Sequence, residues 1–372
     1  MNPIAIIGGG VIGLSIGWQL TRLGAVVALF EKGTAGSEAS SAAAGMITPA
    51  SEVRFGEEDL LKLFLESLNS YPVFIEELEK QSGLSTDFRT DGSLMVALDH
   101  DDEAELNRLH EYQKELGLSV EMISPAEVTA LEPLLSGQCT AAIRADSEYF
   151  LDNLRLIESL KKAFLASGGQ LHEGTRIERL EIEQGKVRAI KAKGERFPVS
   201  TVCLATGIHQ DIEGLGDYLS LPVRPVKGQA LELVNNQTIP LTRAIRTIHR
   251  YPVYLVPRSD GRIVVGATNE EMGLDHRVTG GALLDLLYGA WKILPATAEM
   301  EVRKTWVGFR PTAEDHCPIL GRTGIEGLFV AMGMYRHGIL LTPIVGKLMA
   351  ELMVQEKESK FFDVFGTRRF QN

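Results

Sequence analysis

The residue pattern best suited to chemistry stands near the start of the chain, at Gly8-Gly9-Gly10-Val11-Ile12-Gly13. Gly8 would permit a tight turn, Gly10 a close approach of the backbone to a pyrophosphate, and Gly13 the packing of a helix on a sheet. Glu31 follows Gly13 by 18 residues and could bind both hydroxyls of a ribose. The pattern predicts a dinucleotide site with its phosphates at a helix N-terminus; a glycine-rich turn without a ligand is the alternative.

A second strand–glycine–helix junction stands near the end of the chain, about 300 residues after the first. It spans residues 327–333 and continues through Tyr335-Arg336-His337-Gly338-Ile339-Leu340-Leu341. A third signature, Val202-Cys203-Leu204-Ala205-Thr206-Gly207, lies between the two. A helix N-terminus at the closing junction could stabilise negative charge on a reduced flavin at its N1–O2 edge. The three signatures together favour a flavin dinucleotide, FAD, over a nicotinamide one.

The elements that must position these residues follow from the hydrophobic pattern. Residues 4–7 and 26–30 read as short buried strands, and residues 15–23 between them read as a helix. A strand–helix–strand unit of this kind builds a parallel sheet. We therefore expect an α/β fold: a Rossmann-type FAD-binding domain interleaved with a smaller β-rich substrate domain.

Further helices and hairpins are expected along the rest of the chain, and some of them form that substrate domain. Residues 57–80 have helical spacing despite Pro72, and residues 338–354 form a second helix. Hairpins are predicted over residues 87–98, turning at Asp91-Gly92, and between residues 254–256 and 263–265. No linker interrupts the pattern, so the second domain must be inserted into the first. The expected FAD-binding domain comprises residues 1–86, 145–218 and 302–372, and the substrate domain residues 87–144 and 219–301.

Composition and charge limit the partners. The formal net charge of −11 and the absence of clustered Lys and Arg argue against nucleic acid. The apolar start of the chain follows no basic residue and is shorter than the roughly 20 residues of a spanning helix, so we expect no stable membrane insertion. The three cysteines, Cys139, Cys203 and Cys317, lie far apart and indicate a reducing, cytoplasmic setting. The histidines show no ligand spacing, so no metal is expected.

The opening, middle and closing signatures together resemble the D-amino-acid oxidase superfamily of FAD enzymes, and within it the glycine oxidases of thiamine biosynthesis. The resemblance covers essentially the whole chain. It is most specific in six segments that follow the order of the family: residues 41–46, 225–228, 254–258, 266–268, 308–311 and 335–341. It implies a cofactor, FAD, and a small amino acid and oxygen as reactants.

The resemblance also assigns roles to individual residues. Arg310 corresponds to the arginine that holds the substrate carboxylate in a bidentate pair, and Tyr254 to the tyrosine whose hydroxyl supports it. Met46 would line the pocket beside the flavin, which makes Arg310, Tyr254 and Met46 the expected catalytic residues. The expected cofactor contacts are Gly8, Gly10, Val11, Ile12, Gly13, Glu31, Ser41, Ala44, Gly45, Met46, Thr175, Ile177, Thr206, Gly207, Arg310, Arg336, His337, Gly338, Ile339 and Leu340.

Each of the catalytic residues has an alternative interpretation. Arg310 could be a surface arginine, Tyr254 a core tyrosine, and Met46 ordinary packing. Tyr251 is the rival of Tyr254, because residues three apart on a strand point to opposite faces and only one of them can point into the site.

Two further residues bear on the details. Related sarcosine oxidases attach their flavin to a cysteine near the position of Arg310, but Cys317 lies several residues downstream, so non-covalent FAD is expected. Asn269 follows Gly-Ala-Thr, where glycine oxidases often carry a methionine, and this departure leaves the substrate preference open.

The reaction that the resemblance implies is oxidative deamination. Hydride would pass from the substrate Cα to flavin N5, the imine would hydrolyse to a 2-oxo acid and ammonia, and oxygen would become hydrogen peroxide. Glycine is the favoured substrate, with sarcosine and small D-amino acids possible. A quinone-linked D-amino-acid or proline dehydrogenase is the alternative enzyme, and a flavin-binding assembly protein is a different class. We also expect a homo-oligomer.

Overall fold

The computed structural model describes residues 3–216, 218–234, 241–248 and 252–370. One sheet has six strands in the order β18-β19-β12-β1-β2-β8. Their bounds are β18 (Ile319–Arg322), β19 (Leu328–Met332), β12 (Thr201–Leu204), β1 (Ile4–Ile7), β2 (Val27–Phe30) and β8 (Gln170–His172). All neighbours pair in parallel except β18 with β19. The Rossmann-type parallel sheet expected from the sequence is therefore present.

Both faces of the six-stranded sheet are covered. On one face lie four helices that pack on one another: α1 (Val11–Arg22), α4 (Glu58–Ser82), α7 (Asn153–Ala166) and α9 (Gly338–Gln355). On the other lies a three-stranded sheet of β9 (Arg179–Glu183), β10 (Lys186–Ala192) and β11 (Glu195–Pro198). Strands covered on both sides are almost wholly apolar, which is why the short runs at β1 and β2 could be recognised in the sequence.

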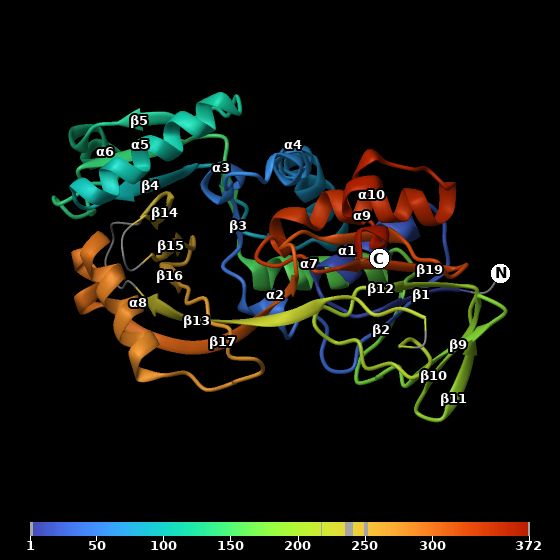
Figure 1. Cartoon of the computed structure of the whole chain (residues 1–372). Coiled ribbons are helices and arrows are strands. Elements are labelled where there is room, and N and C mark those ends of the chain that lie inside the picture. The colour runs from blue at the N-terminus through green and yellow to red at the C-terminus, as the bar shows by residue number, and fades with distance from the viewer. Residues whose placement is uncertain (1–2, 217, 235–240, 249–251, 371–372) are drawn as a thin grey trace.

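The second sheet has eight strands in the order β17-β13-β16-β15-β14-β4-β6-β5. Their bounds are β17 (Glu301–Ala313), β13 (Val223–Val234), β16 (Arg262–Gly266), β15 (Tyr254–Pro257), β14 (Ala244–Thr247), β4 (Ser93–Ala97), β6 (Ala141–Ala145) and β5 (Glu121–Ile123). The predicted hairpin of β15 and β16 is confirmed, with Leu255 opposite Val265. Figure 1 shows this sheet on the left and the six-stranded sheet on the right.

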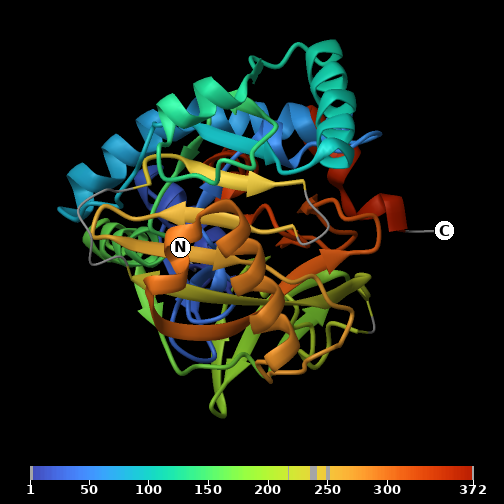
Figure 2. The same ribbon diagram turned by 90° about the vertical axis from the view of Figure 1, so that its left-hand side faces the viewer.

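Helices cover only part of the eight-stranded sheet. α8 (Gly280–Ile293), with the short 3₁₀ helix Pro295–Glu299, and α6 (Pro125–Leu131) complete the core on one face. Figure 2 shows α8 in front of the strands. α5 (His100–Glu115) packs on β4 and β6. Four short elements connect the two sheets: α2 (Ala39–Ala42), β3 (Met46–Ile47), α3 (Pro49–Glu52) and β7 (Tyr149–Phe150). The described chain ends with α10 (Lys360–Phe365) and a 3₁₀ helix, Thr367–Phe370.

Two expectations differ from the structure. The predicted hairpin over residues 87–98 is wrong, because β4 pairs with β6 and β14, not with the residues before it. Gly92 does turn the chain, with φ of +83°, but a turn signal does not determine which strands pair. β17 pairs along its length with β13, so residues 302–313 belong to the eight-stranded sheet rather than to the FAD-binding side. The other boundaries of the interleaved domains stay a prediction.

The helix α9 is long and apolar enough to cross a membrane by length and composition alone. In the fold, 67% of it is buried, and it packs against α1 and α4 in the core of the six-stranded half. Its apolar character is thus accounted for by burial within the protein. The predicted extents of α4 and α9 are confirmed to within a few residues, and α4 continues through Pro72.

Candidate active site

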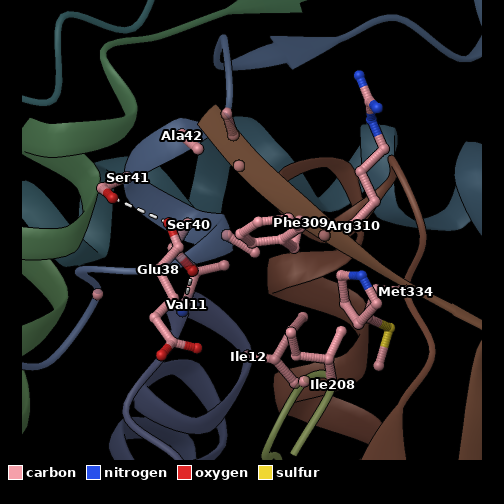
Figure 3. Close-up of a pocket in the computed structure, with 18 of the residues that line it drawn as sticks. Val11, Ile12, Glu38, Ser40, Ser41, Ala42, Ile208, Phe309, Arg310 and Met334 are labelled. Carbon is pink, nitrogen blue, oxygen red and sulfur yellow. Dashed lines mark hydrogen bonds between the residues drawn. The ribbon is translucent and has the colours of Figure 1, made fainter. Parts of the chain in front are cut away.

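A cavity of about 1090 Å³ lies between the two sheets and is lined by residues of both. One end lies at the glycine turn, where Val11 and Ile12 begin α1, and the other at Arg310 on β17 (Figure 3). Most of the residues expected from the sequence line it: Gly8, Gly10, Val11, Ile12, Glu31, Ser41, Ala44, Gly45, Met46, Thr175, Ile177, Thr206, Gly207, Tyr254, Arg310, Arg336, Gly338 and Ile339. The fold therefore brings these distant segments together around one space.

The glycine turn has little room for side chains. Gly8 has φ of +108°, and a Cβ added there would lie 2.3 Å from the carbonyl oxygen of Ala205. A Cβ on Gly13 would lie 1.9 Å from the carbonyl oxygen of Gly8, so Gly13 does not line the cavity but lets α1 pack against the turn. Gly10, the N-cap residue of α1, has no side chain to cap it, and the first turn has no acidic residue. The Val11 N–H donates to Ser40 Oγ at 3.0 Å. The helix N-terminus is thus suited to an anion.

Glu31 occupies the corner of the cavity next to this turn. Its two carboxylate oxygens accept hydrogen bonds from the backbone N–H groups of Gly9 and Gly33, each at 2.8 Å. Nearby, Lys32, Glu38 and His209 form a cluster in which Lys32 lies 2.7 Å from both of the others. The hydrogen bond from His209 is the main cause that lowers the pKa of Glu38 to about 2. The carboxylate of Glu31 is held in place by two backbone groups.

Buried polar side chains outside the loop hold residues 40–46 in place. The amide of Asn153 donates to the carbonyl oxygens of Ser40 and Ser41 at 2.9 and 3.0 Å. The guanidinium of Arg258 donates to the carbonyl oxygen of Ala44 at 2.7 Å. A Cβ on Gly45 would lie 1.9 Å from the carbonyl oxygen of Leu151, so this position requires glycine. The loop that contributes Ala44 and Met46 to the cavity is therefore rigidly held.

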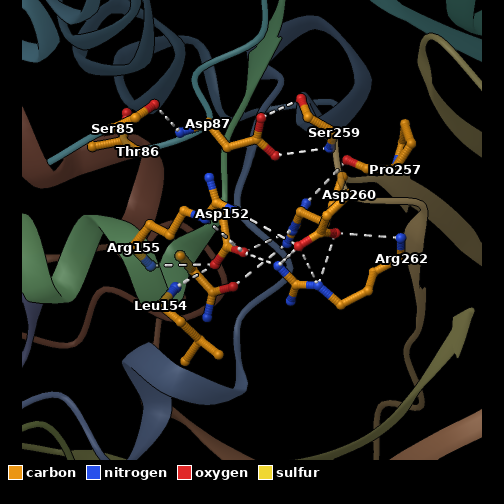
Figure 4. A network of polar contacts seen from close by, with 12 residues as sticks. Ser85, Thr86, Asp87, Asp152, Leu154, Arg155, Pro257, Ser259, Asp260 and Arg262 are labelled. Atoms are coloured by element: carbon orange, nitrogen blue, oxygen red, sulfur yellow. Dashed lines mark hydrogen bonds and ion pairs between the residues drawn. The ribbon is translucent and has the colours of Figure 1, made fainter.

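A network of charges anchors Arg258. Figure 4 shows Asp152, Asp260 and Arg262 of this network. Asp152, which caps α7, lies 2.6 Å from the guanidinium of Arg262 and 3.8 Å from Nε of Arg258. Arg258 is only 3% exposed, and this burial lowers the pKa of its guanidinium. The sequence resemblance included Arg258 in a motif but gave it no role; its contact with Ala44 appears only in the tertiary structure.

Arg310 lies at the far end of the cavity on β17, opposite Val226 of β13. Its guanidinium lies over Gly228, where an added Cβ would be 2.7–2.9 Å from Nη1, Nη2 and Cζ. Nη1 also donates to the carbonyl oxygen of Lys227 at 3.3 Å. A planar fork fixed flat on a glycine presents its remaining N–H groups to the cavity, which suits a carboxylate.

Tyr254 lies on the same sheet and lines the cavity. Its ring covers Gly266, where an added Cβ would lie 2.3 Å from the phenolic oxygen. Burial raises the pKa of Tyr254, so the hydroxyl stays protonated and can donate a hydrogen bond. Its rival from the sequence, Tyr251, lies outside the described residues. The two glycines thus make room for the two side chains that the sequence analysis selected.

Three charged residues close the cavity beside Tyr254. Arg336, which precedes α9, and Arg246 of β14 both form ion pairs with the carboxylate of Glu52. Burial of Glu52 raises its pKa, but the two arginines outweigh this and lower the pKa to about 2. Sequence reasoning missed Glu52 and Arg246, because no motif or spacing connects residues 52, 246 and 336.

His337 and Leu340 differ from the other expected contacts. Both side chains are buried outside the cavity lining, and the ring of His337 packs against Phe64. Burial is the largest cause that lowers the pKa of His337 to about 3, with Arg336 adding to it. His337 is therefore a neutral core residue at ordinary pH.

Cys317 is absent from the residues that line the cavity. Burial and the neighbouring Asp315 raise the pKa of its thiol to about 11. In the described part of the chain, no group of three or more His, Cys, Asp and Glu residues could hold a metal ion. Neither observation favours covalent flavin or metal chemistry at this site.

The donor groups fit FAD. A helix N-terminus that begins at a glycine and has no acid in its first turn suits a pyrophosphate, and the fixed carboxylate of Glu31 suits ribose hydroxyls. The close-packed glycines line a space between the sheets. The space continues past the loop of residues 40–46 to Arg310.

Comparison with known proteins agrees with this geometry. The model of the family "FAD dependent oxidoreductase" matches residues 3–352. Glycine oxidase of Geobacillus kaustophilus is 34% identical over 96% of this chain and 94% of its own length, and the TM-score with its crystal structure is 0.90, over 98% and 97% of the two chains. Iminodiacetate oxidase from Chelativorans sp. BNC1 has a TM-score of 0.87 at 27% identity, over 98% of both chains.

A third relative is longer. The bifunctional protein ThiO/ThiG of Trichormus variabilis is 31% identical over 100% of this chain, which spans 55% of that protein. The fold, the cavity and the family match over nearly the whole chain lead to one conclusion: the chain belongs to the FAD-dependent oxidoreductase family and is an FAD-dependent amino acid oxidase.

Proposed function

We propose that this enzyme oxidatively deaminates a small amino acid, with glycine favoured and sarcosine and small D-amino acids as further substrates. The observation that carries the proposal is the position of Arg310, whose guanidinium lies flat on Gly228 at one end of the cavity that begins at the glycine turn. The relatives named glycine oxidase support glycine as the first candidate.

In this proposal the side chains bind and orient the substrate. Arg310 holds the carboxylate through two N–H groups, and the hydroxyl of Tyr254 donates to the same carboxylate. Because Gly228 and Gly266 are small, the Cα of the substrate can face the loop that carries Met46. Fixing the Cα–H bond in one direction accelerates the reaction because the reacting atoms need no further alignment.

Bound FAD supplies the two-electron acceptor. The Cα–H bond breaks with its electron pair, the amine loses a proton, and a C=N bond forms. Water then hydrolyses the imine to a 2-oxo acid and ammonia. Oxygen takes up the two electrons and two protons and leaves as hydrogen peroxide. Glu52 is a poor general base because its pKa is lowered to about 2. In this proposal no side chain takes the proton of the amine, which binds already deprotonated.

The cofactor contacts follow the cavity. The glycine turn and the start of α1 bind the pyrophosphate, Glu31 binds the ribose, and Thr175 and Ile177 hold the adenosine. The loop of residues 40–46 and the start of α9 enclose the flavin ring. We place the enzyme in the cytoplasm as a homo-oligomer, and the relatives with ThiO in their names support a role in thiamine biosynthesis.

A substrate panel tests the proposal. Purified enzyme is mixed anaerobically with glycine, sarcosine, D-alanine and D-proline, and bleaching of the flavin absorbance is followed; air is then admitted and peroxide is measured. We expect bleaching by glycine and one peroxide for each 2-oxo acid formed. Bleaching without peroxide would instead favour the quinone-linked D-amino-acid or proline dehydrogenase, and no bleaching by any amino acid would refute the proposal.

A further inference from the structure

The cavity beside Tyr254 carries more positive charge than one substrate carboxylate requires. Strand register places Arg246 of β14 directly opposite Tyr254 of β15. Side chains of directly opposed residues in an antiparallel pair share one face of the sheet, and both residues line the cavity. Burial is the main cause that raises the pKa of Tyr254, and the charges of Arg310, Glu52 and Arg246 act on it as well.

The charges in this part of the cavity do not balance. One carboxylate, Glu52, is shared by two guanidiniums, so the group of Glu52, Arg246 and Arg336 keeps one net positive charge. Arg310 adds a second, which a substrate carboxylate neutralises, and the exposed Arg54 and Lys304 also line the cavity. The other described acids of the lining are engaged elsewhere: Glu31 with backbone, Glu38 with Lys32 and His209, and Asp211 with Arg176.

Arg246 is the member of the group best placed to meet a ligand. Its side chain is 27% exposed, against 14% for both Glu52 and Arg336. Arg336 also donates to the backbone carbonyl oxygen of Glu52 at 3.0 Å, so fewer of its N–H groups remain for a ligand. Arg246 donates to Glu52 through Nη1, and Arg246 lines the cavity.

From this charge and position, and resting on the proposed function, we infer that Arg246 is a specificity-determining residue that binds a second carboxylate of the substrate. The pocket then takes small dicarboxylic amino acids, such as an N-carboxymethyl glycine or aspartate, in addition to glycine. The first carboxylate binds Arg310 and Tyr254, and the second binds Arg246 and restores charge balance beside Glu52. A charge-assisted contact of this kind increases affinity by about tenfold or more.

Binding of carboxylates that cannot be oxidised tests the inference without turnover. Acetate and malonate are titrated into the FAD-loaded enzyme, and the change in the flavin absorption spectrum gives each dissociation constant. We expect malonate to bind at least about tenfold more tightly than acetate. Arg246→Gln should remove that difference and leave acetate nearly unchanged. Arg144→Gln, which removes the same charge from the same sheet away from the cavity, should alter neither.

A second variant gives an effect of opposite sign. Glu52→Gln removes the negative charge between the two arginines, so malonate should bind more tightly while acetate changes less. If Arg246 and Glu52 only stabilised the fold, both Arg246→Gln and Glu52→Gln would weaken the binding of acetate and of malonate. That result, or equal binding of acetate and malonate by the unaltered enzyme, would overturn the inference.

Turnover separates this inference from the proposed function. The ratio of kcat/KM for iminodiacetate to that for glycine should fall about tenfold or more in Arg246→Gln. If glycine bleaches the flavin but the carboxylate preference is absent, only the inference about Arg246 fails. If the preference is present but no amino acid bleaches the flavin, only the proposed function fails.

Discussion

At the glycine-turn end of the cavity, the glycines and backbone N–H groups of residues 8–13 meet Glu31 of the same strand–helix–strand unit. At the Arg310 end, the cavity is lined by side chains from strands β14, β15 and β17 and from the segments before α4 and α9. The first end is encoded locally and depends on space, as the clash of a Cβ at Gly8 shows. The second depends on charge and on the register of the eight-stranded sheet. Variants should therefore separate cofactor binding from substrate chemistry.

The largest effect is expected where the two ends join, at Arg258. Arg258→Gln removes a buried charge that holds the Ala44 carbonyl and faces Asp152. The loss should be about 3 kcal/mol of unfolding free energy, at the low end for a broken buried pair because Asp152 keeps Arg262. Urea unfolding of the FAD-saturated enzyme measures it. Arg155→Gln is the matched control: it faces the same aspartate but is 42% exposed, and its loss should stay below about 1 kcal/mol.

Arg310→Lys should disable the substrate end alone. Lysine keeps the charge but not the planar fork, so the carboxylate is held loosely, and a misplacement of about 1 Å costs on the order of 100-fold in rate. Activity on amino acids should fall by that factor, activity on amines without a carboxylate should fall little, and the FAD content should not change. Arg303→Lys, on the exposed side of the same strand, is the control. Equal losses on both substrate types would mean that Arg310 serves structure or flavin tuning.

Glu31→Ala should disable the cofactor end. Losing a charge-assisted pair of hydrogen bonds to the ribose should weaken FAD binding by about 10- to 150-fold. The kcat of the FAD-saturated variant should stay near that of the unaltered enzyme, because Glu31 lies at the opposite end from Arg310. Titration of the apoenzyme with FAD, followed by quenching of flavin fluorescence, gives the affinity. An unchanged dissociation constant, with Glu213→Ala as the exposed control, would remove Glu31 from the site.

The smallest effect concerns Cys317, which lies outside the cavity lining. Acid precipitation should release all FAD into the supernatant, from the unaltered enzyme and from Cys317→Ser alike. The opposite result is flavin absorbance that remains with the precipitated protein of the unaltered enzyme and disappears in Cys317→Ser. It would show a covalent bond between FAD and Cys317 and contradict non-covalent binding.

The sequence determined the local parts of this protein. The strand–glycine–helix unit at residues 4–30, the second junction before α9 and the hairpin of β15 and β16 could be predicted because each depends on neighbours in the chain. The Asp91-Gly92 turn shows the limit, since its turn was correct and its strand pairing was wrong. Resemblance to a family, rather than spacing, selected Arg310 and Tyr254 among many arginines and tyrosines.

Only the tertiary structure decided the environment of those residues. The register of five strands sets Trp306, Ala230, Gly266, Tyr254 and Arg246 in one row across the sheet. That row puts a glycine under the Tyr254 ring and an arginine beside it. Arg310 lies opposite Val226 and reaches diagonally over Gly228, which pairs with Gly308. Glu52 reaches Arg246 across 194 residues of sequence, and Arg258 reaches Ala44 across 214. Charge pairing acts through space and leaves no period in the sequence, so the groups that surround the substrate end could be found only after the chain was folded.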